Sequence, residues 1–312
     1  MIQRVWKESG PRPEPPAHLE PAACFAYCEA VTRAHHENFP VGSFFLPREL
    51  RPHMAALYAF ARLADDFADE PAFAGRRAVL LDRWEDRLMR CFHDEPDHPV
   101  FVAVAETVRR FDLPLAPFAD ILAAFRMDLR IRRYATFGDL MAYVERAARP
   151  IGRLILYVFG ARDAERLRYG DELATALALT SFWQDIRRDL ARGRVYIPDE
   201  DLRHFGVSEA DLAAGRQTPA LATLFRFEVA RTRAHYERAR PLLGKVPPDF
   251  AVELALFWHG GRRALDKVEA RAQRIFGPRA GLGAADKALV LARALASTAV
   301  RGMRPTAPPA TG

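Results

Sequence analysis

Two pairs of aspartates are the residues of this chain best suited to do chemistry. Asp65 and Asp69 stand four residues apart in YAFARLADDFADE, and Asp185 and Asp189 stand four apart in SFWQDIRRD. In a helix this spacing places both side chains on one face. Like charges there repel by roughly 0.2–0.5 kcal/mol per pair. The pattern therefore predicts a cation between the carboxylates, and Mg²⁺ suits oxygen ligands and shares substrate phosphates.

The first acidic segment is predicted to be an amphipathic helix. A helical wheel over residues 54–70 gives one broad apolar arc, and a stripe on its flank carries Tyr58, Arg62, Asp65 and Asp69. Asp66 and Glu70 fall on the far side, where we expect solvent. A stripe that borders the core is where a cavity wall would lie. The alternative is a polar flank in which Arg62 pairs with one of the aspartates on its stripe, a contact worth little.

The second acidic segment gives the same picture. Asp185 and Asp189 again flank an apolar arc, with Ala178 and Ser181 on their stripe. Arg187 falls on a different face, whereas Arg188 lies near enough to reach a ligand phosphate.

Downstream of that segment a basic loop follows in the long connection 191–207. It contains Arg192, Arg194 and Tyr196. Arginine matches phosphate oxygens with two parallel hydrogen bonds, so the loop is a plausible phosphate clamp. The alternative is surface arginines on a turn. The chain thus has two aspartate pairs, each on the flank of the apolar arc of a predicted helix. Together they favour a site for a metal and a diphosphate.

Composition excludes several other classes of function. The chain has 312 residues, 50% of them hydrophobic and 28% charged, and a net charge of +6. The arginines are scattered and no nucleic-acid motif is present. No apolar run approaches the ~18 residues of a membrane span, and no secretory signal is recognised. Three cysteines form neither a disulfide framework nor a zinc pattern, which favours a reducing cytosol.

The chain is predicted to be all-α, with an irregular arm at 1–17, one domain at 18–300 and a Pro-rich disordered tail at 301–312. Apolar residues recur at three- and four-residue spacing, and breaks carry Pro or Gly. The predicted helices are 18–36, 48–70, 74–93, 98–111, 115–129, 137–147, 149–160, 163–191, 208–214, 218–243, 248–259, 261–275 and 283–300. The connection 191–207 is predicted to be a functional loop.

Four motifs resemble those of the squalene and phytoene synthases, enzymes that join prenyl diphosphates head to head. They are ENFPVGSFFLP (37–47), LYAFARLADDFADE (57–70), ARPIGRLIL (148–156) and SFWQDIRRDLARGRVYIP (181–198). The aspartates of the family's two motifs match the two pairs named above. An R-x-Y-x-P pattern matches Arg194, Tyr196 and Pro198. The resemblance covers most of residues 25–270.

Within that family the chain is most similar to the bacterial hydroxysqualene synthases of hopanoid biosynthesis. Asn38 and Phe39 stand where members that form presqualene diphosphate or phytoene usually carry Ser-Phe, and Gln184 replaces an Arg. Two departures concern the metal: Ser181 replaces a metal-facing Asn, and Ala178 replaces a Gln. In addition, the second Tyr of a Y-x-Y motif that begins at Tyr143 is replaced by Glu145.

The resemblance implies a single-domain isoprenoid synthase bundle with a central apolar cavity and the aspartate pairs facing each other at its mouth. Mg²⁺ would be held by Asp65, Asp69, Asp185 and Asp189, with Ser181 offering a hydroxyl oxygen. The substrate-binding residues that it implies are Tyr58, Arg62, Asn38, Phe39, Phe182, Gln184, Arg188, Arg194 and Tyr196. Among these, the arginines and Tyr196 hold the diphosphate, and aromatic faces such as Phe39, Phe182, Phe44 and Tyr58 shield a carbocation.

The implied reaction is ionisation of presqualene diphosphate and capture of the rearranged cation by water, which gives hydroxysqualene and diphosphate. This is the reaction of a carbon–oxygen lyase, and no dinucleotide fingerprint is present. One alternative is a transferase of the same family that condenses two prenyl diphosphates, such as farnesyl diphosphate, to presqualene diphosphate, squalene or phytoene. A head-to-tail prenyltransferase is disfavoured by D-x-x-x-D at 185–189. A third alternative is a catalytically impaired scaffold. We expect a cytoplasmic protein, and leave open peripheral membrane contact and other pathway enzymes as partners.

Overall fold

Helices make up the regular structure of residues 13–34 and 45–302, the parts of the chain that this computed structural model describes. No strand occurs in these ranges, so the prediction of an all-α fold is confirmed. The helices are α1 (Pro21–Ala34), α3 (Arg51–Asp69), η3 (Pro71–Phe73), α4 (Arg77–Phe92), α5 (Pro99–Phe111), α6 (Leu115–Arg130), α7 (Phe137–Ala147), α8 (Arg149–Val158), α9 (Ala164–Gln184), α10 (Ile186–Ala191), α11 (Asp199–His204), α12 (Glu209–Ala213), α13 (Pro219–Ala239), η4 (Arg240–Gly244), α14 (Pro248–Glu269) and α15 (Ala284–Gly302).

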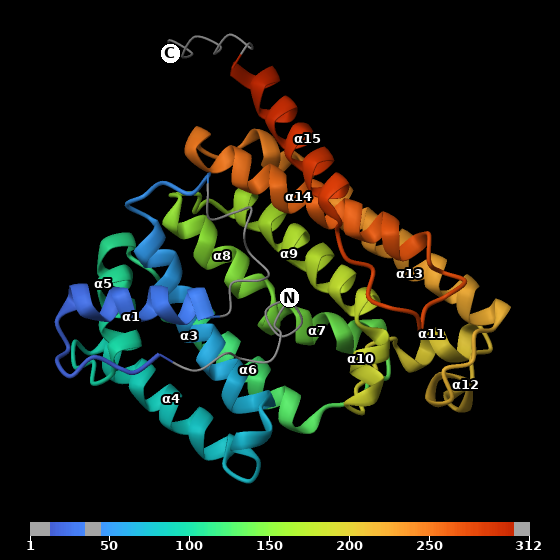
Figure 1. Ribbon diagram of the computed structural model, residues 1–312, viewed down its shortest axis with the longest axis horizontal. Helices are drawn as coiled ribbons and strands as arrows, with labels where there is room; N and C mark the ends of the chain where they lie inside the picture. The colour runs from blue at the N-terminus through green and yellow to red at the C-terminus, as the bar shows by residue number, and fades with distance from the viewer. Residues whose placement is uncertain (1–12, 35–44, 303–312) are drawn as a thin grey trace.

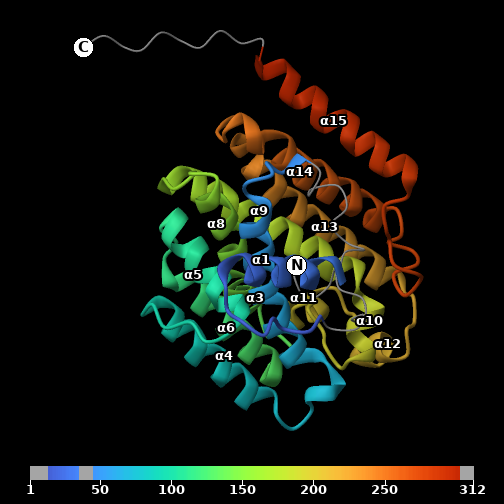
Figure 2. The same cartoon turned by 60° about the vertical axis from the view of Figure 1, so that its left-hand side comes forward.

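The helix α9 runs through the middle of the bundle and packs against α8, α13 and α14 (Figure 1). The earlier helices α1, α3, α4, α5 and α6 pack on one another to one side of it. The last helix, α15, lies on the outside of α14, at the edge of the molecule (Figure 2). The first acidic segment is therefore in the N-terminal group of helices and the second is at the end of the central helix.

The sequence of α3 explains both its start and its end. Pro52 occupies the first turn, where its missing N–H costs nothing. Small residues along the helix let it pack closely against α1 and α5. Pro71 then favours an extended backbone at the preceding residue, and Glu70 has φ −72° and ψ 138°. As a result Asp69 is the last helical residue, at the end of α3.

The predicted helix 163–191 is not continuous, since the structure breaks it at Asp185. This residue has φ −108° and ψ 12°, and separates α9 from α10. Hydrogen bonds still cross the break, from Asp185 N to Ser181 O at 3.1 Å and from Asp189 N to Asp185 O at 2.9 Å. The two aspartates therefore keep roughly their helical spacing. Aspartate is a weak helix former because its side chain finds partners elsewhere, and here that partner is Arg279.

Three other predicted boundaries are wrong. The pair Gly260–Gly261 does not end a helix, because α14 continues through it and Gly261 packs tightly on Tyr236. The segment 218–243 ends in the 3₁₀ turn η4, since Pro241 lacks the N–H that an α-helical turn would use. The predicted loop 191–207 contains the short helix α11.

The predicted arm and tail lie largely outside the described residues, and their boundaries stay predictions. The first described helix begins at Pro21 rather than at residue 18.

No helix among the described residues has both the length and the hydropathy that crossing a membrane requires.

The two adjacent glycines of α14 give a matched test of packing. A Cβ on Gly261 would lie 2.2 Å from the Tyr236 hydroxyl, which contacts Thr180 at 3.0 Å, whereas a Cβ on Gly260 would meet nothing closer than Val290 at 3.8 Å. We expect Gly261→Ala to lower the free energy of unfolding by about 1–3 kcal/mol through overpacking. Gly260→Ala is expected to raise it by up to about 1 kcal/mol, because Ala favours the helix. Urea unfolding of both variants measures this, and equal effects would contradict the packing argument.

Glu253 gives a test of pH dependence. It is buried in α14, and burial raises the pKa of its carboxyl to about 7. Between the ordinary pKa of 4.5 and about 7 the folded state keeps a proton that the unfolded state loses, so stability falls as pH rises through this window. Glu253→Gln should therefore gain up to about 3 kcal/mol relative to the native chain at pH 8 and little at pH 4.5, at about 1.4 kcal/mol per pKa unit. Urea unfolding at both pH values, with the exposed Glu49→Gln as control, measures the difference. A pH-independent difference would refute it.

Candidate active site

Asp65 is buried inside the bundle rather than on a solvated flank. The residue is 3% exposed, and its Oδ1 has no hydrogen-bond partner among the described residues. Burial and the nearby Asp69 raise the pKa of Asp65 well above its usual range, and Arg62 opposes them only in part. A divalent cation beside the carboxylate would favour the ionised form instead.

Arg62 holds the acidic residues of α3 together. Its guanidinium lies 2.6 Å from Asp66, 3.5 Å from Asp65 and 3.8 Å from Glu70. The prediction that Asp66 faces solvent is wrong, since only 1% of it is exposed. Burying an aspartate is costly without a paired charge, and Arg62 supplies that charge. Glu70 is partly exposed. Tyr58, one turn earlier, is half-buried, and burial raises its pKa.

Two arginines join the end of α3 to the loop after α10. Arg194 contacts Asp69 with both terminal nitrogens, at 2.5 and 3.3 Å, and Arg192 contacts the same carboxylate at 2.9 Å. The backbone N of Arg194 donates to Asp189 O at 2.8 Å. Burial disfavours the charge of Arg194, but Tyr196, Asp69 and Asp128 more than compensate and raise its pKa. Arg194 therefore connects Asp69 to the second acidic segment through its own side chain and backbone.

The second acidic segment also has an arginine on its carboxylate. Arg279, in the connection between α14 and α15, donates to Asp185 Oδ1 at 2.7 Å. The adjacent Ala280 accepts a hydrogen bond from the Gln184 side chain through its carbonyl, at 2.6 Å. Asp185 Oδ2 is buried and has no hydrogen-bond partner among the described residues. Sequence reasoning missed Arg279, because it lies in a Gly- and Pro-rich loop outside both motifs.

A cluster of aromatic rings lies beside the arginine bridge. Phe182 stacks on Tyr196 with ring centroids 4.3 Å apart, and Tyr134 and Tyr143 contact the same ring. The Tyr143 hydroxyl donates to the buried carboxylate of Asp128 at 3.1 Å. Sequence reasoning missed Asp128 too, although an aspartate within the apolar pattern of 115–129 was a signal.

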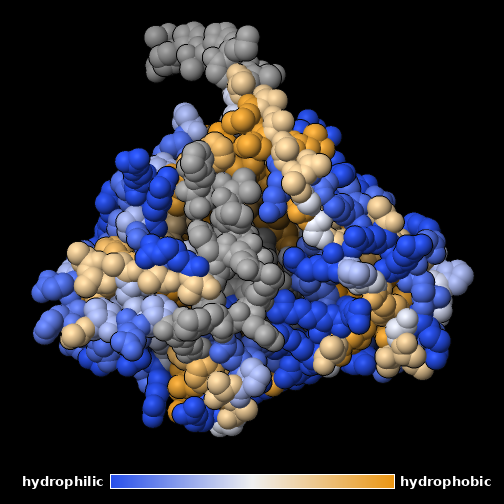
Figure 3. Space-filling model, viewed as in Figure 1, coloured by the Kyte–Doolittle hydropathy of each residue, from blue (hydrophilic) through white to orange (hydrophobic). Residues whose placement is uncertain are grey.

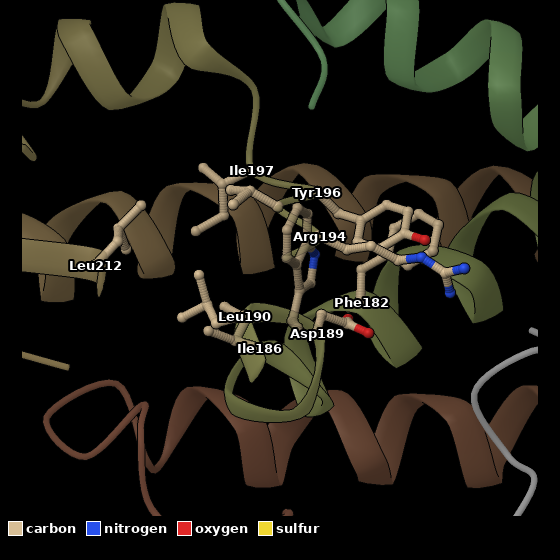
Figure 4. Close-up of a pocket in the computed structure, with 10 residues that line it drawn as sticks. Phe182, Ile186, Asp189, Leu190, Arg194, Tyr196, Ile197 and Leu212 are labelled. Carbon is tan, nitrogen blue, oxygen red and sulfur yellow. The ribbon is translucent and has the colours of Figure 1, made fainter. Parts of the chain in front are cut away.

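A small pocket next to these rings has polar groups on one side and apolar side chains on the other. Figure 4 shows the Asp189 carboxylate, the Arg194 guanidinium and the Tyr196 hydroxyl on the polar side, and Ile186 and Leu212 on the other. Asp189 is 7% exposed and Ser181 is buried on α9, next to the buried Ala178. Arg188 is half-buried on α10, and Arg187 is exposed, as predicted.

An apolar pocket lies further along α9. Its lining consists entirely of apolar residues and glycines from α8, α9, η4 and α14: Ala148, Ile151, Gly152, Ile155, Leu156, Gly170, Leu173, Ala174, Leu177, Leu242, Phe250, Leu254 and Phe257. Leu177 lies one turn before Ser181 on the same face of α9. Figure 3 shows a hollow with hydrophobic walls over these helices. The pocket therefore extends away from the carboxylates along one helix face.

The donor set fits a hard divalent cation. Two buried carboxylate oxygens, on Asp65 and Asp185, lack hydrogen-bond partners among the described residues. Within those residues, no three acidic, histidine or cysteine side chains converge closely enough to hold a metal alone. Mg²⁺ commonly binds through one or two carboxylates and completes its shell with water and substrate phosphate. Each aspartate pair is thus suited to part of a coordination shell, with a diphosphate supplying the rest.

Asn38 and Phe39, predicted to bind substrate, lie outside the described residues, as does Phe44.

Comparison with known proteins identifies the family. The family model described as squalene/phytoene synthase matches residues 32–286. The chain belongs to the squalene/phytoene synthase family. Enzymes of this family act on prenyl diphosphates and depend on divalent metals. The predicted resemblance is therefore confirmed at the level of family and fold.

Relatives within the family differ in their reported names. The 15-cis-phytoene synthase of Synechocystis sp. is 32% identical over 314 residues and covers 93% of each chain. The phytoene synthase of Arthrospira platensis is 32% identical over 271 residues, which cover 82% of this chain and 87% of that protein. The crystal structure of squalene synthase HpnC from Alicyclobacillus acidocaldarius is 40% identical, with a TM-score of 0.78, and covers 84% of this chain and 98% of that one. A dehydrosqualene synthase structure, 24% identical, shares the fold with a TM-score of 0.82 and covers 90% and 98% of the two chains.

The two arginines on Asp69 give a matched test of the bridge. The side chain of Arg194 is 6% exposed, whereas that of Arg192 is 42% exposed. Removing one partner of a buried ion pair costs about 3–5 kcal/mol, and removing one partner of an exposed pair costs about 1 kcal/mol or less. We expect Arg194→Ala to lower the free energy of unfolding by at least about 3 kcal/mol and Arg192→Ala by less than about 1 kcal/mol, measured by urea unfolding. Equal losses would show that Arg194 is not the buried member of the bridge.

Proposed function

We propose that this protein is a Mg²⁺-dependent enzyme that ionises presqualene diphosphate and lets water capture the rearranged cation, giving hydroxysqualene and diphosphate. The observation that carries the proposal is the placement of two aspartate pairs, in which all but Asp69 are buried, linked through Arg194 beside the apolar pocket along α9. This arrangement offers ligands for metal and diphosphate at one end and an apolar wall for a prenyl chain beyond it.

In the proposed reaction, Asp65, Asp69, Asp185 and Asp189 hold Mg²⁺, with Ser181 offering a hydroxyl oxygen. Bound Mg²⁺ would neutralise the charge that develops on the departing diphosphate. Arg192, Arg194 and Arg279 already lie on the carboxylates of these motifs. With a metal on the carboxylate oxygens, the same guanidinium groups would be available to hold the diphosphate, whose oxygens they match with paired hydrogen bonds.

The apolar and aromatic residues have a different task. The pocket along α8, α9 and α14 carries no charged side chain, so it accepts hydrocarbon and keeps water away from it. The stacked rings of Phe182 and Tyr196 present π-faces next to Arg194 and Asp189 (Figure 4). Aromatic faces attract cations, and the effect grows when water is excluded. We propose that Phe182 and Tyr196, with Tyr58, Arg62, Arg188, Gln184, Asn38 and Phe39, contact the substrate.

Two observations bear on the choice between water capture and condensation. The solved structure named a squalene synthase is 40% identical, while the phytoene synthases are 32% identical. Gln184, which replaces a common Arg of the family's second motif, bonds the α14–α15 connection rather than leaving a cation for a second diphosphate. The Gln184 contact supports a reaction with one diphosphate, whereas the name of the squalene synthase relative supports condensation. The names of the phytoene synthase relatives support head-to-head condensation as the second candidate.

One product assay separates the candidates. The full chain with Mg²⁺ is incubated with presqualene diphosphate, and separately with farnesyl and geranylgeranyl diphosphate, each with and without NADPH. Hydroxysqualene from presqualene diphosphate without NADPH supports the proposal. Presqualene diphosphate, squalene or phytoene as the only product supports condensation. Failure to turn over any prenyl diphosphate would favour the impaired scaffold.

Variants test the metal ligands directly. Asp65→Ala and Asp185→Ala are expected to lower kcat by at least about a hundredfold, because each removes charge stabilisation of the leaving group. Asp266→Ala, which removes a half-exposed carboxylate paired with Arg233 on the surface, is the control and should keep full activity. Circular dichroism checks that the helices persist. Full activity in either motif variant would remove that residue from the metal site.

A further inference from the structure

The outer face of α15 is an unusually apolar surface for an exposed helix. Its inner face is fixed to α14: Asp286 pairs with Lys267 and with Arg263 at 2.7 Å, and Val290 and Ala294 are buried. The outer stripe, which we call the α15 outer face, contains no charged residue. It consists of Ala285, Ala288, Leu289, Ala292, Leu295, Ala296 and Ala299.

Two leucines give this face most of its hydrophobic area. Leu289 and Leu295 are 38% and 44% exposed, and they are among the few large apolar side chains exposed on the described part of the molecule. Figure 3 shows the visible side of α15 in hydrophobic colours along most of its length, next to the hydrophobic hollow. Figure 2 shows α15 at the margin of the molecule, with no other helix on its outer side.

The charges that the sequence places along and after this face, from Lys287 onward, have one sign. Arg293 borders the stripe and is exposed. From Lys287 to the end of the sequence there are four basic residues and no acidic one. An apolar helix face flanked by cations is the pattern of a helix that lies in the interface of an anionic membrane. The same cations would repel each other across a symmetric contact between two copies of this helix.

We propose that the α15 outer face binds the surface of an anionic lipid bilayer. Leu289 and Leu295 enter the boundary between headgroups and acyl chains, and Arg293 contacts lipid phosphates. The helix lies flat, because its inner face stays on α14. The adjacent hydrophobic hollow would then face the bilayer, from which a water-insoluble prenyl compound can enter the site without crossing water. The binding itself depends on α15 and not on which reaction the enzyme catalyses.

Sedimentation with vesicles tests this proposal. The full chain is mixed at low salt with vesicles of phosphatidylcholine alone, or of phosphatidylcholine containing phosphatidylglycerol. We expect binding to the anionic vesicles that weakens as salt is added, since exposed charges are screened. Leu289→Glu with Leu295→Glu should reduce the partition coefficient about tenfold or more, because two apolar contacts are lost and two repulsive charges are added.

The control variant replaces two equally exposed apolar residues elsewhere. Val79 and Met89 are 53% and 41% exposed and belong to α4, a helix that lies across the molecule from α15 (Figure 1). Val79→Glu with Met89→Glu adds the same charge and should bind vesicles as the native chain does. Absence of native binding to anionic vesicles, or equal losses in both variants, would overturn the proposal. So would a native dimer that only the α15 variant dissociates, without vesicle binding, since the occupant of the face would then be a second copy.

Discussion

The contact between Asp69 and Arg194 is the interaction on which the rest of the site depends. It joins the last residue of α3 to the loop that follows α10, across 125 positions of sequence. The backbone of the same arginine is bonded to Asp189, so a single residue positions one acidic segment against the other. Without it, only the exposed Arg192 would join the carboxylate of Asp69 to the loop that follows α10.

The site is therefore a balance of buried charges rather than a set of separate pairs. Arg62 stabilises two aspartates of α3 and the Glu70 that follows it, Arg192 and Arg194 stabilise Asp69, and Arg279 stabilises Asp185. Ion pairs of this kind add little net stability, because removing both charges from water costs about as much as their attraction gains. Their role here is positional: each carboxylate is held in place with a guanidinium near it, whether the arginine is buried, as Arg62 and Arg194 are, or exposed, as Arg192 and Arg279 are.

The sequence predicted the helices that carry the site more accurately than it predicted the side-chain contacts between them. The spacing of residues in 54–70 was enough to predict α3 and to place Asp65 and Asp69 on one stripe of it, because both depend only on local periodicity. The helical wheel wrongly placed Asp66 in solvent, because a wheel assumes that one face of the helix is solvated, whereas α3 is covered on almost all sides. The prediction also failed at Gly260–Gly261, where the close approach of Tyr236 rather than a chain break explains the glycine. Arg279 and Asp128 reach the site through tertiary folding alone, which no local pattern encodes.

The ends of α3 and α9 carry a further consequence for the site. Both helices stop at an acidic residue, α3 at Asp69 and α9 just before Asp185. The C-terminal end of a helix bears a partial negative charge from its unpaired carbonyls and aligned peptide dipoles. Arg194 holds the end of α3 close to the second acidic segment, through its side chain on Asp69 and its backbone N–H on Asp189, so the peptide dipoles of α3 add to the field of the carboxylates there. A variant with neutral side chains in both motifs would therefore still attract cations to some extent, because the backbone dipoles at a helix end do not depend on the side chains.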